Sequence, residues 1–174
     1  LLIDSHYAAA RKFLATYGIS PQEDRVIAVQ PRASGVVKRF DVDARFLDGA
    51  ALTQGIVSQS TLFLDQTRSL KIETGTEKQL AENIDVKRLL SPAAEVYPRF
   101  DDGTDNGPPV YIAAAAERGA ARDPRVQVKS SRLLVFGNSA FADPDSINRL
   151  NWDLMTRSLN WMLHRDVVAP NDSA

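Results

Sequence analysis

The sequence predicts an α/β fold, arranged as a three-layer sandwich with a mostly parallel central sheet. One observation is the order of elements near the start, where a short apolar run (1–3), a helical stretch (6–17) and a second apolar run (26–29) give a β-α-β pattern. The other is that the predicted strands carry few polar residues, as do strands buried on both faces.

The first half of the chain carries these elements in order. Asp4 and Ser5 form a helix-capping turn after the first strand, and Gly18 stands where the cap at the end of the helix belongs. Further strands are predicted at 36–42, 61–64 and 86–90, where Ser91-Pro92 ends the last one. Residues 48–55 are predicted as a loop or a short helix, and 71–83 as a strand that runs into an exposed loop.

The second half gives clearer signals. Residues 101–109 (DDGTDNGPP) are typical of a surface loop, and 110–116 (VYIAAAA) are predicted as a central strand after the Pro-Pro pair. Residues 132–136 (RLLVF) form the clearest strand, ended by Gly137, and 151–163 the clearest helix. We expect one face of this helix to carry Leu154, Met155, Leu159 and Met162, and Trp152 and Trp161 to pack in the interior.

Composition limits what the chain can do. Its 174 residues are enough for one domain, predicted over 1–168, with 169–174 as a linker or tail. A net charge of −1, with basic residues scattered among acids, argues against nucleic-acid binding. The absence of cysteine excludes disulfides, thiolate metal sites and a cysteine nucleophile.

The chain has no run of the roughly 18–20 apolar residues that a membrane span needs. It opens directly on Leu1-Leu2-Ile3, which predicts a fragment of a larger protein whose sheet is truncated at its N-terminal side.

Gly137-Asn138-Ser139 follows a strand, as the nucleophile elbow of α/β hydrolases does. Phe141 stands in place of the second glycine. The only two histidines are His6, at the start of the first predicted helix, and His164, in the last turn of the final one, where the helix dipole explains it. The alternative is a tight turn in which Asn138 and Ser139 hydrogen-bond to the backbone. No metal-ligand spacing and no glycine-rich phosphate loop is present, so we expect no metal and no cofactor.

A ligand site is suggested by the polar residues at predicted strand ends. In a parallel sheet, Asp4, Glu117, Arg118, Asn138 and Ser139 would lie along one edge, where ligands of α/β proteins gather. The alternative is an ion pair and capping groups that hold the loops together.

Several segments taken together resemble the gliding-motility-type ABC transporter auxiliary family. The C-terminal block resembles it most specifically, with RLLVFGNSAF (132–141) followed by NWDL (151–154) and LNWML (159–163). Weaker similarities lie in LLIDS (1–5), in the helix end around Tyr17-Gly18-Ile19, in TQGI (53–56) and in the strand before Glu117-Arg118-Gly119. Asn138 and Ala140 stand where that family has acids in a G-D-S-D-F turn.

This resemblance implies a glutamine amidotransferase-like or flavodoxin-like fold without amidotransferase activity, since that chemistry needs a Cys-His pair. It implies an extracytoplasmic (periplasmic) accessory domain of a membrane-anchored protein, held between membrane segments outside these residues, that works beside an ABC permease and ATPase. We therefore expect a non-enzymatic domain that binds a partner protein or an envelope or exported ligand. Two alternatives are a small-molecule or glycan binding module at the strand-end edge, and a divergent serine hydrolase centred on Ser139.

Overall fold

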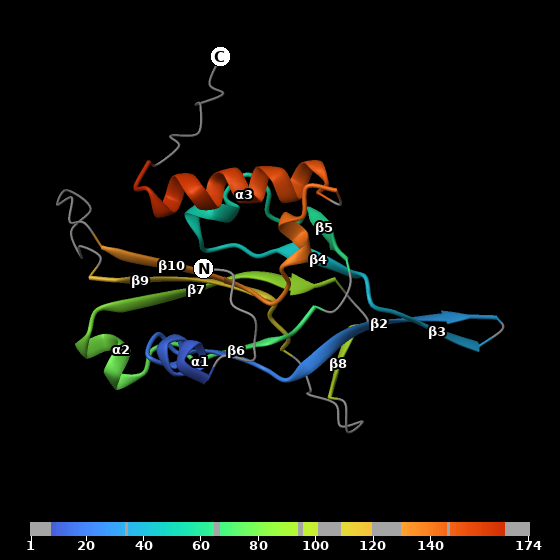
Figure 1. The fold of residues 1–174 in the computed structure, drawn as a ribbon, viewed down its shortest axis with the longest axis horizontal. Helices are drawn as coiled ribbons and strands as arrows, with labels where there is room; N and C mark the ends of the chain where they lie inside the picture. The colour runs from blue at the N-terminus through green and yellow to red at the C-terminus, as the bar shows by residue number, and fades with distance from the viewer. Residues whose placement is uncertain are drawn as a thin grey trace, which may run out of the picture.

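The structure is a computed structural model that places two small β assemblies beside one larger sheet (Figure 1). The residues that it describes are 8–33, 35–64, 67–93, 96–100, 109–119, 130–145 and 147–165.

The largest sheet has five strands in the order β10-β9-β7-β4-β5, and each neighbouring pair is antiparallel. The inner strands β7 and β9 pair in a register that runs from Ile84↔Arg118 to Leu90↔Ala113, with a bulge before Leu90. The five strands are β4 (Val42–Phe46), β5 (Ser60–Phe63), β7 (Ile84–Pro92), β9 (Ala113–Arg118) and β10 (Ser131–Phe136).

Two smaller sheets flank this one, and both are antiparallel. One is a two-stranded ribbon of β1 (Ile19–Pro21) and β6 (Leu70–Ile72). The other has the order β3-β2-β8 and consists of β2 (Asp24–Arg32), β3 (Gly35–Arg39) and β8 (Val96–Phe100).

Helices cover the large sheet on both sides (Figure 1). The helix α3 (Arg149–Met162) lies along one face together with two 3₁₀ turns, η1 (Ala51–Thr53) and η2 (Ala140–Ala142). The other face carries α1 (Ala8–Ala15), α2 (Glu77–Ala81) and the β1-β6 ribbon.

Asparagines attach α3 to the outer strand β5. Asn148 caps the helix by accepting a hydrogen bond from the N–H of Asn151, 2.9 Å away. Asn151 is fully buried; it accepts a hydrogen bond from the Thr61 hydroxyl at 2.7 Å and donates to the Leu62 carbonyl at 3.2 Å. Because buried polar groups need partners, these bonds fix the position of the helix on the sheet.

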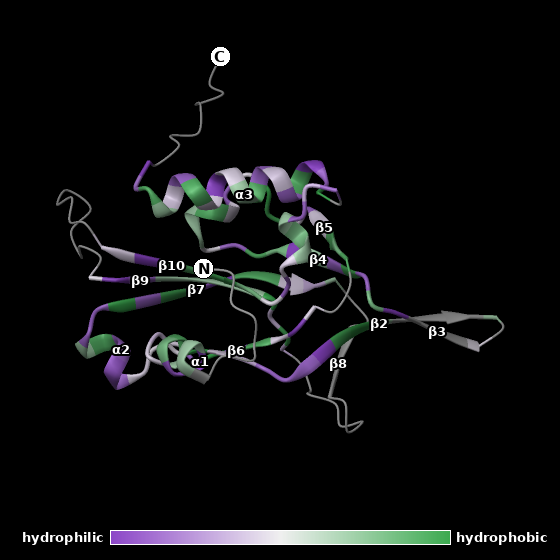
Figure 2. Ribbon diagram, in the orientation of Figure 1, coloured by the Kyte–Doolittle hydropathy of each residue, from purple (hydrophilic) through white to green (hydrophobic). Residues whose placement is uncertain are grey.

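The interior has two hydrophobic clusters, one on each face of the large sheet, and β9 contributes to both. Ala113 and Ala115 belong to the cluster under α3, which includes Phe46, Phe63 and Leu154. Ala114 and Ala116 belong to the cluster under α1, with Leu14 and Tyr17. Figure 2 shows hydrophobic residues, in green, concentrated on the strands between the two layers.

The prediction of a mostly parallel sheet, and with it the amidotransferase-like or flavodoxin-like architecture, is wrong. Every strand pair among the described residues is antiparallel. The apolar runs of β9 and β10 are buried because both faces of the sheet are covered, and an antiparallel strand in that position needs the same side chains as a parallel one. The first predicted strand, 1–3, lies outside the described residues.

Several individual elements are confirmed and several differ. The structure confirms helices within 6–17 and 151–163, strands at 26–29, 61–64, 86–90 and 132–136, and a short helix within 48–55. The predicted strand 36–42 is divided between β3 and β4. The segment 71–83 contains a helix, α2, which the prediction missed, and the predicted loop at 101–108 lies outside the described residues.

Candidate functional site

The predicted strand-end residues do not lie along one edge. In the antiparallel register of β9 and β10, Arg118 faces Ser131 while Ala113 faces Phe136. Glu117 and Arg118 therefore lie at one end of β10, and Asn138 and Ser139 follow its other end. Asp4 lies outside the described residues. The expected shared edge was wrong because it depended on parallel strands.

Asn138 holds the turn after β10. Its side chain is buried and donates hydrogen bonds to the Leu64 carbonyl and the Thr67 hydroxyl, both at 2.8 Å. Its oxygen accepts a bond from the N–H of Phe141 at 3.2 Å. These contacts agree with the alternative in which this residue hydrogen-bonds to the backbone of a tight turn.

Ser139 is exposed and lies far from the only histidine that the structure describes. The His164 ring nitrogen Nε2 lies 3.1 Å from the Ser130 carbonyl oxygen, at the other end of β10, and His6 is outside the described residues. The described part of the chain thus gives the Ser139 hydroxyl no imidazole base, which the hydrolase hypothesis requires.

Glu117 belongs to a half-buried polar cluster that joins β9, β10 and the end of α3. Its carboxylate accepts hydrogen bonds from the Ser130 hydroxyl and from Arg132 Nε, the latter at 2.8 Å. Arg132 also donates to the Trp161 carbonyl at 2.6 Å, and its guanidinium lies 4.9 Å from the centre of the Trp161 ring. Each charge in the cluster has a partner, so the arrangement is that of a structural clamp.

The pKa of Glu117 reflects this clamp. Burial alone would raise the pKa, but the hydrogen bonds from Ser130 and Arg132 and the positive charges of Arg132 and His164 outweigh it and hold the pKa below its ordinary value of 4.5. Since the folded-state pKa is lowered, the clamp stabilises the fold above the unfolded-state pKa, and this contribution is lost as the pH falls through the folded-state value.

We expect Glu117→Gln to lower the free energy of unfolding by about 1–2 kcal/mol at pH 7, because Arg132 loses its carboxylate partner. Urea unfolding of both proteins at a series of pH values measures the difference. The difference in stability between the two proteins should narrow as the pH falls from 4.5 through the lowered folded-state pKa, because the wild-type carboxylate then becomes protonated. A gap that stays constant down to acidic pH would contradict the clamp.

The side chain of Arg118 lies on the opposite face of the large sheet from the side chain of Glu117. Its guanidinium lies 4.6 Å from the centre of the Tyr17 ring and forms an ion pair with Glu82 at 2.9 Å. These neighbours in sequence therefore tie β9 to two different layers, instead of forming an ion pair with one another.

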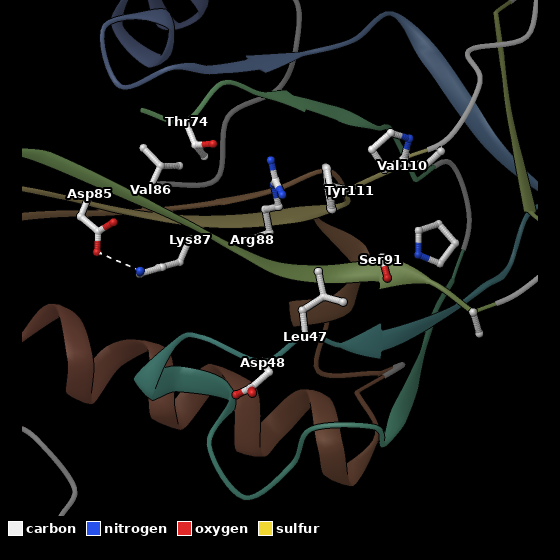
Figure 3. A pocket seen from close by; sticks show the side chains of 13 residues that line it. Leu47, Asp48, Thr74, Asp85, Val86, Lys87, Arg88, Ser91, Val110 and Tyr111 are labelled. Carbon is white, nitrogen blue, oxygen red and sulfur yellow. Dashed lines mark ion pairs between the residues drawn. The ribbon is translucent and has the colours of Figure 1, made fainter. Parts of the chain in front are cut away.

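An open groove with a volume of about 880 Å³ lies beside β7, and it was not predicted. Figure 3 shows Val86, Arg88 and Tyr111 on one side of the β7 ribbon and Asp85 and Lys87 on the other. The lining residues come from four parts of the chain: Leu47, Asp48, Thr74, Asp85, Val86, Lys87, Arg88, Ser91, Pro92, Ala93, Pro109, Val110 and Tyr111.

The two sides of β7 present different charges to the groove. Lys87 and Asp85 form an ion pair at 3.3 Å on one side of β7. On the other side the Arg88 guanidinium lies 4.8 Å from the centre of the Tyr111 ring, and the described residues give it no acidic partner. The groove therefore presents one cation, supported by an aromatic ring, that is available to a ligand.

The outer face of α3 carries exposed apolar side chains, which corrects two expectations. Trp152 was predicted to pack in the interior and Leu159 to share a face with Leu154, but Trp152 and Leu159 are 61% and 51% exposed, and Leu163 after the helix is 58% exposed. With Thr156 these residues follow a 4-3-4 spacing, which places them on one stripe. Trp161 is partly buried against the core under α3.

No cluster of three metal-binding side chains occurs among the described residues. Within the same residues, no helix combines the length and the apolar character that crossing a bilayer requires. Comparison with protein-family models, curated proteins and solved structures finds no match to this chain.

Proposed function

We propose that this chain is a non-catalytic accessory domain of an ABC-type transport system, and that it binds a partner subunit outside the cytoplasm through the outer face of α3. The claim that the domain binds a partner rests on the exposed stripe of Trp152, Leu159 and Leu163. The claim that it belongs to a transport system rests on the resemblance of the C-terminal strand-turn-helix block, 132–163, to the ABC transporter auxiliary family. In this proposal the membrane anchor belongs to segments outside these residues.

The α3 stripe has the spacing that helix-helix contacts use. Residues 152, 156, 159 and 163 alternate by four and three positions, as do the apolar positions of a helix that packs against another helix. The opposite side of α3 is already engaged, because Leu154 is completely buried and Arg157 donates to the Gln54 carbonyl at 2.8 Å. A helix held rigidly on one side and apolar on the other is suited to receive an amphipathic helix of the permease.

The non-catalytic half is supported by the side chains present. The sequence has no cysteine, and His164, which contacts the Ser130 carbonyl, is separated from Ser139 by the length of β10. In this proposal the domain binds a partner subunit and catalyses no reaction.

We expect Leu159→Glu to reduce binding to the permease at least tenfold without unfolding the domain, since an exposed residue contributes little to stability. The test is co-purification from membranes after co-expression with whatever permease and ATPase genes stand beside the reading frame. Lys78→Glu, on the exposed surface of α2 across the sheet, is the control and should bind normally.

A photo-crosslinking amino acid at position 152 adds a direct readout and should label the permease, whereas one at position 78 should not. Equal labelling from both faces would contradict the α3 interface. A reading frame with no ATPase and permease genes beside it would refute the transport assignment and leave the interface to be tested separately.

A further inference from the structure

We propose that the groove beside β7 binds an extended peptide, which adds to the large sheet as a strand and places an acidic side chain against Arg88. This site uses none of the α3 residues and goes beyond the proposed function.

The proposal starts from an incomplete strand pairing. β4 pairs with β7 only from Phe46↔Leu90 to Ala44↔Pro92, although β7 begins at Ile84. After Leu47, whose N–H still donates to the Leu89 carbonyl at 2.8 Å, the chain turns out of the sheet. Gly49 makes this turn with a φ of +96°, and its N–H bonds to the Asp48 side chain.

The departure of β4 leaves a vacant position in the sheet. On that side of β7 no strand of the described chain pairs with residues 84–88. The groove occupies this position, bordered by Leu47 and Asp48 on one side and by Thr74 and Tyr111 on the other (Figure 3). An unpaired strand edge offers alternating N–H and C=O groups, and an extended chain has the matching repeat.

Charge identifies which peptide fits. The side chains of an added strand would alternate between the two faces, as those of β7 do. On one face they meet the Asp85–Lys87 ion pair, whose charges already balance. On the other they meet Arg88, held over Tyr111, beside Val86 and Thr74. A glutamate or aspartate on this face would form a charge-assisted hydrogen bond with the guanidinium.

Two features of β7 also occur in strands that resist pairing. Lysine and a bulge are both used to protect exposed edges, and β7 has Lys87 in the middle of the vacant stretch and a bulge between Arg88 and Leu90. The bulge lies at the end of the stretch, where β4 begins to pair, so residues 84–88 keep a continuous edge.

The test uses the whole chain and a fluorescent six-residue peptide of alternating glutamate and valine, with binding followed by anisotropy. We expect saturable binding and NMR shifts in the amides of residues 84–88. Methylation of alternate peptide nitrogens should weaken binding at least tenfold, because it removes the strand hydrogen bonds and leaves the protein unchanged. No binding up to about 1 mM, or equal binding of the methylated peptide, would overturn strand addition.

Arg88→Glu tests the charge. The substitution should lower the affinity for the glutamate-valine peptide about tenfold and raise the affinity for a lysine-valine peptide by a similar factor. Arg149→Glu makes the same charge change at the start of α3, where an acid is tolerated, and should leave both affinities unchanged. If the two variants change binding equally, only net charge matters and the proposed contact with Arg88 is wrong. The melting temperatures of both variants show whether the fold is intact.

Discussion

Gly137→Ala is expected to lower the free energy of unfolding by about 4 kcal/mol or more, a large part of the roughly 5–15 kcal/mol by which an ordinary domain is stable. A Cβ atom at this position would lie 2.0 Å from the Arg68 carbonyl oxygen and 3.0 Å from its carbonyl carbon. The segments around residues 68 and 137 cannot easily move apart. The N–H of Arg68 donates to the Gly137 carbonyl, and the N–H of Gly137 donates to the Ile112 carbonyl, each at 2.8 Å.

Circular dichroism during urea unfolding measures this effect. Gly55→Ala is the matched control, since a Cβ at Gly55 meets nothing within 4 Å and the substitution carries only the strain of a φ of +80°. That strain should cost about 1 kcal/mol. If the two variants were equally stable, the close approach of residues 68 and 137 would not be the reason for the glycine.

Asn138→Asp is expected to destabilise the protein by about 3 kcal/mol at pH 7. The amide of Asn138 donates to the Leu64 carbonyl and the Thr67 hydroxyl, and an ionised carboxylate would bring a second acceptor to the same buried carbonyl. The contact with the Leu64 carbonyl gives a physical reason why this chain has an amide at position 138.

The pH dependence of this variant has a defined sign. Burial beside an acceptor should raise the pKa of the introduced carboxyl above its unfolded-state value, so the protonated form, which can donate, becomes favoured. The loss of stability should therefore be largest at pH 7 and shrink toward pH 4. Thermal unfolding at several pH values, with the exposed Ser139→Asp as control, measures it. A loss that does not depend on pH would mean that the amide acts through its shape alone.

Local sequence patterns predicted local structure well. The helix expected at 151–163 is α3 (Arg149–Met162), and the strand expected at 132–136 is β10. Gly18, expected to end the first helix, has a φ of +78°. These features depend on neighbouring residues, which periodicity and capping rules describe.

Strand direction depends on contacts between distant residues, and there the prediction failed. The alternation Val42-Asp43-Ala44-Arg45-Phe46 in β4 is a signal for a half-solvated antiparallel strand, and its burial alternates in the same way. The β-α-β interpretation of the N-terminal part was extended to the whole sheet instead. The missed helix α2 has a recognisable start, because Thr76 and Gln79 form a capping box. The helix has only five residues, too few to show the apolar stripe by which helices were predicted.

The candidate sites were less predictable for the same reason. The groove brings together residues near positions 47, 74, 88 and 111, and no local pattern connects them. On α3, apolar residues occur on more than one side of the helix, so periodicity could not separate the core face with Leu154 from the exposed face with Trp152.

The alternating alanines of β9 have a consequence for how the protein loses its structure. Ala113 and Ala115 contact one cluster while Ala114 and Ala116 contact the other, so the two hydrophobic layers share a single strand. Neither layer can open completely without exposing one side of β9 to water, which weakens the support of the other layer. The two faces of the large sheet are therefore coupled into one cooperative unit, and a ligand or partner that stabilises one face protects the other as well.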